Sequence, residues 1–315
     1  MTGLVLLCWA AAVAVAARPL LAGRQWTRSA PRLAIGLWLA AELSVAVAVL
    51  TAGLLIAIPP VALHSNLSGI LAACAQALAS LGPADSALTA TALAATGTLA
   101  GRLVLGLTVT FGRARRWRHR HSAALSPVTR RGEQRDSLIV DHALPVVYCL
   151  PGRPGRIVAT RAALDVLSPA ELAAVFEHER AHLRGRHHLL VAFAAAFHRA
   201  FPQLALAAAA EIEIRRLVEH LADDHAGRRH DRRLIATAIV RLADATPEHA
   251  LGAATVAVDR VRRMLAPAVP IPAIRRLLAV TALGALLTVP PALAAVPVAV
   301  HDAACSHTTA AGADT

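Results

Sequence analysis

Four long apolar blocks, separated by polar segments, dominate the pattern along the chain. They lie at about 4–17, 33–58, 88–111 and 277–300. A helix needs about 20 apolar residues to cross a bilayer, so the last three blocks are long enough and the first is short. No basic segment precedes the first block, so we expect an uncleaved span rather than a signal peptide. The pattern predicts a mainly α, multi-pass membrane protein.

Composition supports this interpretation and narrows the class of partner. Hydrophobic residues make up 56% of the chain and charged residues 17%, with a net charge of +12. All 32 basic residues are arginines, and many of them stand beside the apolar blocks. Such arginines first indicate membrane orientation and contact with the lipid bilayer. Aromatic residues are only 3%, too few for a stacking platform, so we expect no direct nucleic-acid partner.

The arginines give one consistent orientation in the cell membrane. Residues 18–32 carry four arginines and no acid, and five more follow the third block between Arg113 and Arg120. By contrast, the stretch 61–87 has no arginine. Since basic residues favour the cytoplasmic side, we expect 18–32 and everything from 112 to the last block to be cytoplasmic. The stretch 61–87 should then lie outside.

This orientation divides the chain into four parts. They are an N-terminal region with three spans (1–111), a cytoplasmic region (112–274), a fourth span (275–300) and a short external tail (301–315) that we expect not to fold alone. Pro290 and Pro291 should kink or end the final span. The arginines of 113–120 should contact anionic lipid.

Two charges fall inside the predicted spans. Glu42 and Arg102 each lie about nine residues from the cytoplasmic end of their block, hence at similar depth with a rise of ~1.5 Å per residue. A lone charge in hydrocarbon is costly, so we expect a Glu42–Arg102 ion pair. The alternative is that each side chain snorkels or faces a water-filled crevice.

The polar region carries local signals for a small β-hairpin and a capped helix. Val146–Cys149 and Arg156–Thr160 read as strands, joined by the Pro/Gly-rich loop 151–155. Ser168, Pro169 and Glu171 then form a capping box with proline at the first helical position. Further helices should follow, with a break at Pro202.

The capped helix contains the pattern His-Glu-x-x-His. His178 and His182 are four residues apart and share a helix face, so both imidazoles can bind one Zn²⁺ ion. Glu179 can take a proton from water bound to the open position of the metal. We expect the nearby His187 and His188 to be solvent or helix-terminus histidines, and His198 to be a satisfied interfacial one.

A third metal ligand must come from elsewhere. Glu219 and Asp223 are four apart on one predicted helix, so Glu219 could bind the metal while Asp223 orients a ligand histidine. His220 and His225 are competing donors in the same segment.

These motifs resemble one known family. Tyr148–Gly152, Leu167–Leu172, His178–His188 and Glu219–Asp223 are similar to the BlaR/MecR-type integral membrane zinc metallopeptidases, relatives of the heat-shock and CAAX-prenyl membrane proteases. The resemblance implies a helical gluzincin fold with a cytoplasmic active site and one zinc per chain. It also implies Glu219 as third ligand and Asp223 as its supporting partner. Only residues 301–315 follow the last block, so we do not expect the penicillin-binding sensor domain or its β-lactam ligand.

The expected function is a membrane-bound zinc endopeptidase acting on a cytoplasmic or membrane-proximal protein. In the similar family that substrate is a small winged-helix repressor, an implication that rests on analogy. Two other classes stay open: a signalling membrane protein that relays an external cue, and a catalytically silent membrane scaffold. An intramembrane site-two-type protease is disfavoured, because its motif lies in an apolar span whereas 177–188 is heavily charged.

Overall fold

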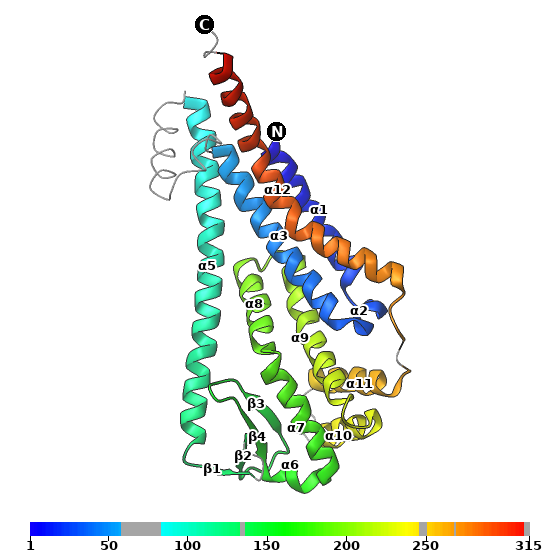
Figure 1. Ribbon diagram of the computed structural model, residues 1–315. Coiled ribbons are helices and arrows are strands. Elements are labelled where there is room, and N and C mark those ends of the chain that lie inside the picture. The colour runs from blue at the N-terminus through cyan, green and yellow to red at the C-terminus, as the bar shows by residue number, and fades with distance from the viewer. Residues whose placement is uncertain (58–82, 133–135, 246–250, 268, 312–315) are drawn as a thin grey trace.

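The computed structural model describes residues 1–57, 83–132, 136–245, 251–267 and 269–311. The molecule is elongated, with long helices at one end and a small sheet surrounded by shorter helices at the other (Figure 1). The stretch 61–87, predicted to lie outside, falls mostly beyond the described residues.

Four helices coincide with the apolar blocks. They are α1 (Thr2–Leu21), α3 (Pro31–Ala57), α5 (Pro83–Leu125) and α12 (Ala273–Ala311), with the short α2 (Gln25–Ser29) between the first two. All four long helices contain a stretch long and apolar enough to cross a membrane. Large apolar side chains such as Leu105 and Leu278 are exposed on their outer faces, which suits a lipid environment. The composition and structure together indicate a membrane protein.

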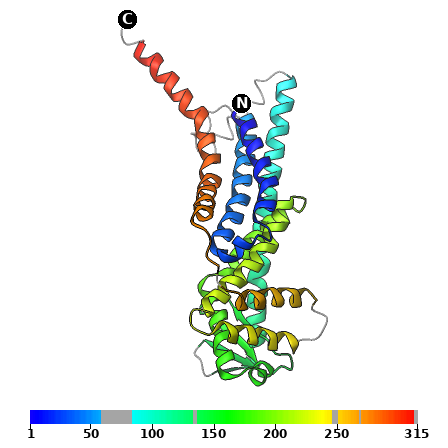
Figure 2. The ribbon, with the colours of Figure 1, turned by 90° about the vertical axis from the view of Figure 1, so that its right-hand side faces the viewer.

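Two of these helices extend further than the apolar pattern predicted. Helix α5 continues to Leu125, so the arginines of 113–120 stand on a helix. Helix α12 passes through Pro290 and Pro291 and runs on to Ala311, into the segment expected to be an unfolded tail. Figure 2 shows that its axis changes direction partway along, which fits a proline kink, but the helix does not end there.

Small side chains let the bundle helices pack closely. Helix α3 lies against α1, α12 and α5, with alanines such as Ala34, Ala48 and Ala52 fully buried along it. Trp38 and Leu6 are among the large side chains that fill this core.

The predicted Glu42–Arg102 ion pair is absent from the described structure. The Nε atom of Arg102 donates a hydrogen bond to the carbonyl of Ala200 at 2.9 Å. Glu42 is fully buried, and neither of its carboxylate oxygens has a hydrogen-bond partner among the described residues. The prediction was wrong because similar depth does not fix how each helix is rotated about its axis.

A helical hairpin enters the bundle from the other end of the molecule. Helices α8 (His187–Ala200) and α9 (Ala205–Ala226) meet at the predicted break around Pro202, and pack on α5 and α3 respectively. At Gly106 of α5 an added Cβ would lie 2.6 Å from the Ala196 carbonyl, so glycine permits this close approach. His198 pairs with Glu211 across the hairpin at 2.7 Å, which confirms it as a satisfied interfacial histidine.

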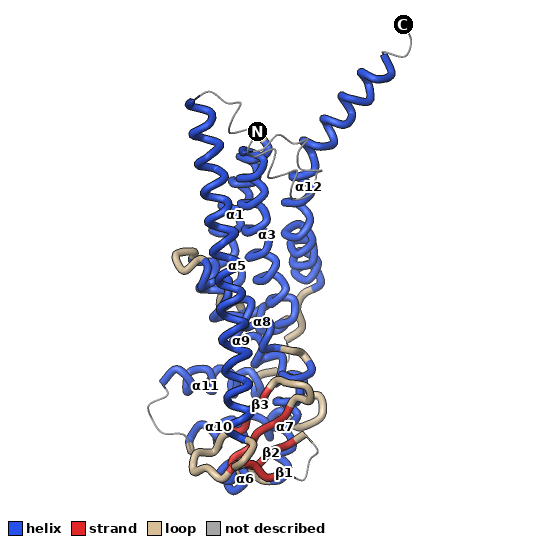
Figure 3. The backbone as a smooth tube through the Cα atoms, turned by 90° about the vertical axis from the view of Figure 1, so that its left-hand side faces the viewer, coloured by secondary structure: helices blue, strands red, loops and turns tan. Residues whose placement is uncertain are grey.

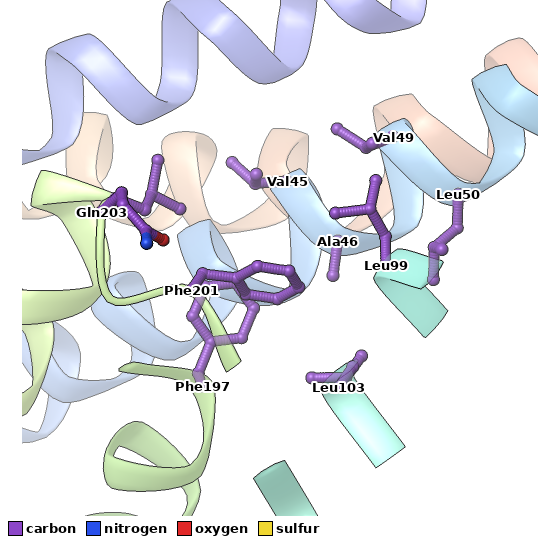
Figure 4. Close-up of a pocket in the computed structure, with 10 residues that line it drawn as sticks. Val45, Ala46, Val49, Leu50, Leu99, Leu103, Phe197, Phe201 and Gln203 are labelled. Atoms are coloured by element: carbon purple, nitrogen blue, oxygen red, sulfur yellow. The ribbon is translucent and has the colours of Figure 1, made fainter. Parts of the chain in front are cut away.

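An apolar cavity of about 340 Å³ lies at the tip of this hairpin. Side chains of α3, α5 and the hairpin point into it, including Val49, Leu103, Phe197 and Phe201, while the Gln203 amide stands at its edge (Figure 4). The hairpin therefore reaches the same level as the middle of α3 and α5.

A four-stranded sheet lies at the opposite end from the chain termini (Figure 3). It consists of β1 (Thr129–Arg131), β2 (Ser137–Val140), β3 (Val147–Leu150) and β4 (Arg156–Thr160), in the order β1-β2-β4-β3. The predicted hairpin is the antiparallel β3–β4 pair, with Tyr148 opposite Val158. Strands β1 and β2 were not predicted. Strand β3 stands at an edge of the sheet.

The remaining helices surround the motif. Helices α6 (Arg161–Val166) and α7 (Pro169–Arg184) follow the sheet, and α10 (Arg232–Asp244) and α11 (Leu251–Leu265) follow the hairpin. The capping box of α7 is confirmed: the Ser168 hydroxyl accepts from the Glu171 backbone N–H, and the Glu171 carboxylate accepts from the Ser168 backbone N–H. This cap fixes where the helix begins and so which residues face the sheet.

Candidate metal centre

Three side chains from two helices converge beneath the sheet. His178 and His182 stand on one face of α7, and Glu219 reaches them from α9. The two Nε2 atoms are 3.1 Å apart, and the Glu219 carboxylate oxygens lie 3.4 Å from Nε2 of His178 and 3.5 Å from Nε2 of His182. The structure thus brings together the three residues singled out as metal ligands.

The spacing of these atoms suits a tetrahedral zinc ion. Zinc binds imidazole nitrogen and carboxylate oxygen at ~2.0–2.2 Å, and neighbouring corners of such a tetrahedron are roughly 3.3–3.6 Å apart. The Nε2–Nε2 separation of 3.1 Å is close to that value. The 3.4 and 3.5 Å contacts involve different oxygens of Glu219, and one ligand atom from each of the three residues lies within 4.8 Å of the others. Two neutral imidazoles and one carboxylate are also a donor set that zinc prefers, with a fourth position left open.

Asp223 supports this group from behind. Its Oδ1 atom lies 3.0 Å from Nδ1 of His178, and its side chain is completely buried. The contact leaves Nε2 of His178 directed at Glu219 and fixes the imidazole orientation. Asp223 therefore lies where it was predicted to lie.

Arg260 of α11 is part of the same cluster and was not predicted. Its guanidinium donates to both Asp223 oxygens, from Nε at 2.9 Å and from Nη2 at 2.6 Å, and Nη1 lies 3.3 Å from Glu219. This two-point contact compensates the buried Asp223 charge. No local pattern could have identified it, because Arg260 lies 37 residues from Asp223 and its helix contains other arginines.

The electrostatics of the cluster match its contacts. Burial opposes the charged form of each group, yet the hydrogen bonds that His178 donates to Asp223 and Glu219 raise its pKa to about 9. Burial, with the charge of His178, lowers the pKa of His182 to about 3. For Glu219 burial is outweighed by His178 and Arg260, and its pKa falls to about 2. Glu219 is thus an anion and His182 a neutral donor at neutral pH, while His178 holds a proton between the two carboxylates that a bound metal would have to displace.

The Glu179 side chain lies next to Cys149 of the edge strand β3, whereas Asp223 supports the metal ligands through His178. Burial raises the pKa of its carboxyl, and both the thiol and the backbone of Cys149 form hydrogen bonds with it. Burial likewise raises the pKa of the Cys149 thiol to about 12, so the thiol stays neutral. A carboxylate of raised pKa next to a metal site is suited to accept a proton.

The other histidines considered in the sequence are not part of the converging group of His178, His182 and Glu219. His187 and His188 are the first two residues of α8, which confirms them as helix-terminus histidines, but His187 is buried rather than in solvent, and its Nδ1 lies 3.0 Å from Nδ1 of His182. A Cβ at Gly185 would collide with the His187 ring, so the lack of a side chain at Gly185 leaves room for that ring. His220 contacts Asp259 and His225 contacts Glu177, so neither belongs to the converging group.

One cleft contains the ligand group and the edge strand. Its volume is about 610 Å³, and Val147, Tyr148 and Cys149 of β3 form one wall. His178, Glu179, His182 and Glu219 form its floor, together with Arg260. Apolar side chains of α10, including Ile235, Ile239 and Leu242, also line the cleft. An extended peptide laid along β3 would lie in the same cleft as Glu179.

Comparison with known proteins gives one match. Neither a search of curated proteins nor a search of solved structures found a similar protein. The model of one protein family matches residues 146–252, which begin at the edge strand and include both helices that supply the three converging side chains. That model is described as peptidase family M48, and the match indicates a metallopeptidase in this part of the chain.

Proposed function

We propose that the protein is a membrane-bound zinc endopeptidase that hydrolyses peptide bonds of a cytoplasmic or membrane-proximal protein. The observation that carries this proposal is the convergence of His178, His182 and Glu219 within one cleft beside an edge strand. The match to peptidase family M48 over the same residues supports it. The gluzincin type and the specific kinship to BlaR/MecR-type proteins are parts of the proposal that rest on the motifs.

Each residue has a defined task in this mechanism. Bound to His178, His182 and Glu219, zinc would supply a Lewis acid and an acidified water. Glu179 accepts the proton of the attacking water and passes it to the leaving amine nitrogen. Asp223 holds the His178 ring in place, and Arg260 holds Asp223.

The edge strand accounts for peptide binding. Among the described residues, β3 pairs only with β4, so its outer edge can pair with an extended substrate backbone, as in other cases of strand addition. The apolar wall of α10 then faces one side chain of the bound segment, so we expect a preference for apolar residues next to the cleaved bond. Cleavage of a winged-helix repressor, implied by the family resemblance, remains a proposal about the substrate.

The cytoplasmic placement is supported by contacts of the first arginine-rich segment. Arg28 of α2 pairs with Asp259 of α11 at 3.0 Å, and Arg263 donates to the Arg28 carbonyl. The segment 18–32 and the cleft region therefore lie on the same side of any membrane crossed by α1 and α3. Since the arginines favour the cytoplasm, we propose that the active site lies on that side as well.

Removal of the metal tests the proposal. We expect the purified full-length protein in detergent to cleave an unfolded protein such as casein, and the cleavage to stop after treatment with 1,10-phenanthroline. Adding back about one equivalent of Zn²⁺ should restore it, because three ligands remain in place. Cleavage that persists in a preparation shown by elemental analysis to lack zinc would contradict the assignment.

A change at Arg260 tests its supporting role. Arg260→Gln leaves the buried Asp223 carboxylate without its two-point partner, so His178 is held less firmly. We expect zinc affinity to fall about 10- to 100-fold, as for other groups behind metal ligands. Competition with a chelator of known affinity measures this directly. The matched control is Arg262→Gln on the same helix, which should leave zinc affinity unchanged.

A further inference from the structure

A second cavity, of about 1040 Å³, lies between the cytoplasmic part of α5, the β3–β4 connection and the turn that joins α7 to α8. Figure 1 shows the lower part of α5 running beside this end of the molecule. The cavity is separate from the cleft of the metal centre, since the two share no lining residue. We call it the basic cavity.

Its lining is strongly positive. Helix α5 contributes Arg115, Arg118 and His119, which share one helix face at the spacing i, i+3, i+4. The other walls add three further arginines and one histidine: Arg153, Arg156, Arg186 and His188. Among the residues described as lining the cavity, none is acidic. Like charges gathered in one concave space favour an anionic occupant.

Several of these groups point to a ligand rather than to internal ion pairs. Within the described part of the chain, no carboxylate pairs with Arg115, Arg118 or Arg186. The Nδ1 atom of His188 is buried without a hydrogen-bond partner. Arg186 adopts a positive φ of 48°, a conformation in which glycine or asparagine is usual, so the chain holds a large cation at a strained position.

A narrower groove continues from the basic cavity toward the bundle. It has a volume of about 290 Å³ and shares Arg118, Pro151 and His188 with the cavity. Its other walls are largely apolar, with Trp117 and Ala114 of α5 facing Val191 and Ala195 of α8. A headgroup site followed by an apolar groove that runs along a membrane-spanning helix matches the two ends of a lipid. An acidic peptide would account for the basic cavity but not for the apolar walls of the groove.

We infer that the basic cavity binds the phosphate headgroup of an anionic phospholipid, with an acyl chain in the adjoining groove. The inference rests on the proposed membrane location but not on the proposed peptidase activity. Bound lipid would join α5, the β3–β4 connection and Arg186, which lies two residues after the end of the motif helix α7. The lipid would thus hold the edge strand and the metal-binding helix in a fixed relation to the membrane surface.

Lipid retention by the full-length protein tests this inference. The protein is purified in neutral detergent, mixed with phosphatidylglycerol or phosphatidylcholine, and bound lipid is measured by native mass spectrometry. We expect one phosphatidylglycerol per chain and no comparable retention of phosphatidylcholine. Arg115→Gln/Arg118→Gln should weaken phosphatidylglycerol binding by about tenfold or more, since two cations that attract the anionic headgroup are removed. Arg115→Lys/Arg118→Lys should keep most of the binding.

The matched control lies on the same helix. Arg116 and Arg120 belong to the same basic run but do not line the cavity, so Arg116→Gln/Arg120→Gln should bind phosphatidylglycerol as the wild type does. Equal loss in both double variants would show diffuse attraction and overturn the site. Competition by inorganic phosphate or by an aspartate-rich peptide as strong as that by the lipid would overturn the choice of ligand. Because the readout is bound lipid, a chain without peptidase activity could still give the expected result.

Discussion

Purified Glu179→Gln protein should retain one zinc ion per chain and lose peptide cleavage by about 10²–10⁴-fold, the usual contribution of a general base. Glutamine has nearly the same shape but cannot accept the proton of the attacking water. Because Glu179 is not among the three converging side chains, metal binding should be unaffected. Cleavage of a fluorogenic peptide, with zinc measured in the same sample, checks both parts.

The control for this variant is Glu211→Gln on α9, which loses only its pairing with Arg215 and His198. It should cleave at the wild-type rate, since pairs of this partly exposed kind contribute little. Full activity in Glu179→Gln protein would remove Glu179 from the mechanism. Loss of zinc in that variant would instead mean that Glu179 itself binds the metal.

Glu219→Gln should lose both the metal and the activity. This substitution removes the one anionic donor of the group, so the remaining imidazoles provide only two strong ligands. After dialysis against a moderate chelator, we expect zinc well below one ion per chain and no cleavage at ambient zinc. High zinc should restore part of the activity, because His178 and His182 are still in place.

Asp224→Asn on the same helix serves as the control, since Asp224 pairs with Arg263 at 2.8 Å rather than facing the cleft. It should keep its zinc. If Glu219→Gln protein kept its zinc while His187→Ala protein lost it, His187 would be the third ligand. The contact of His187 with His182 makes that the sharpest competing assignment.

Local patterns predicted the parts of the site that depend on neighbouring residues. The four-residue spacing of His178 and His182 sets their common face, and the Ser168–Glu171 box sets where their helix begins. The β3–β4 hairpin followed from two short strand-like stretches joined by a Pro/Gly-rich loop. Each of these features is set by residues that are close together in the sequence.

Features that depend on the packing of distant segments were missed or wrong. Arg260 reaches Asp223 only because α11 packs against α9. Arg102 caps the end of α8 rather than pairing with Glu42, because α8 packs against α5. The α8–α9 hairpin was predicted as helix, but α8 has only 14 residues, and α9, with 22, carries many charged residues, so neither is recognised as a membrane span.

The edge position of β3 makes the proposed enzyme selective for unfolded segments rather than for particular sequences. Hydrogen bonds along a strand edge involve the peptide backbone, which every protein shares, so most sequences could bind once extended. A folded domain has its own backbone groups already paired and would have to open first. Susceptibility would then depend on where a target exposes an unfolded stretch and whether that stretch comes close to the membrane. A transient loss of structure in the target, more than any particular sequence, would decide which proteins are cut.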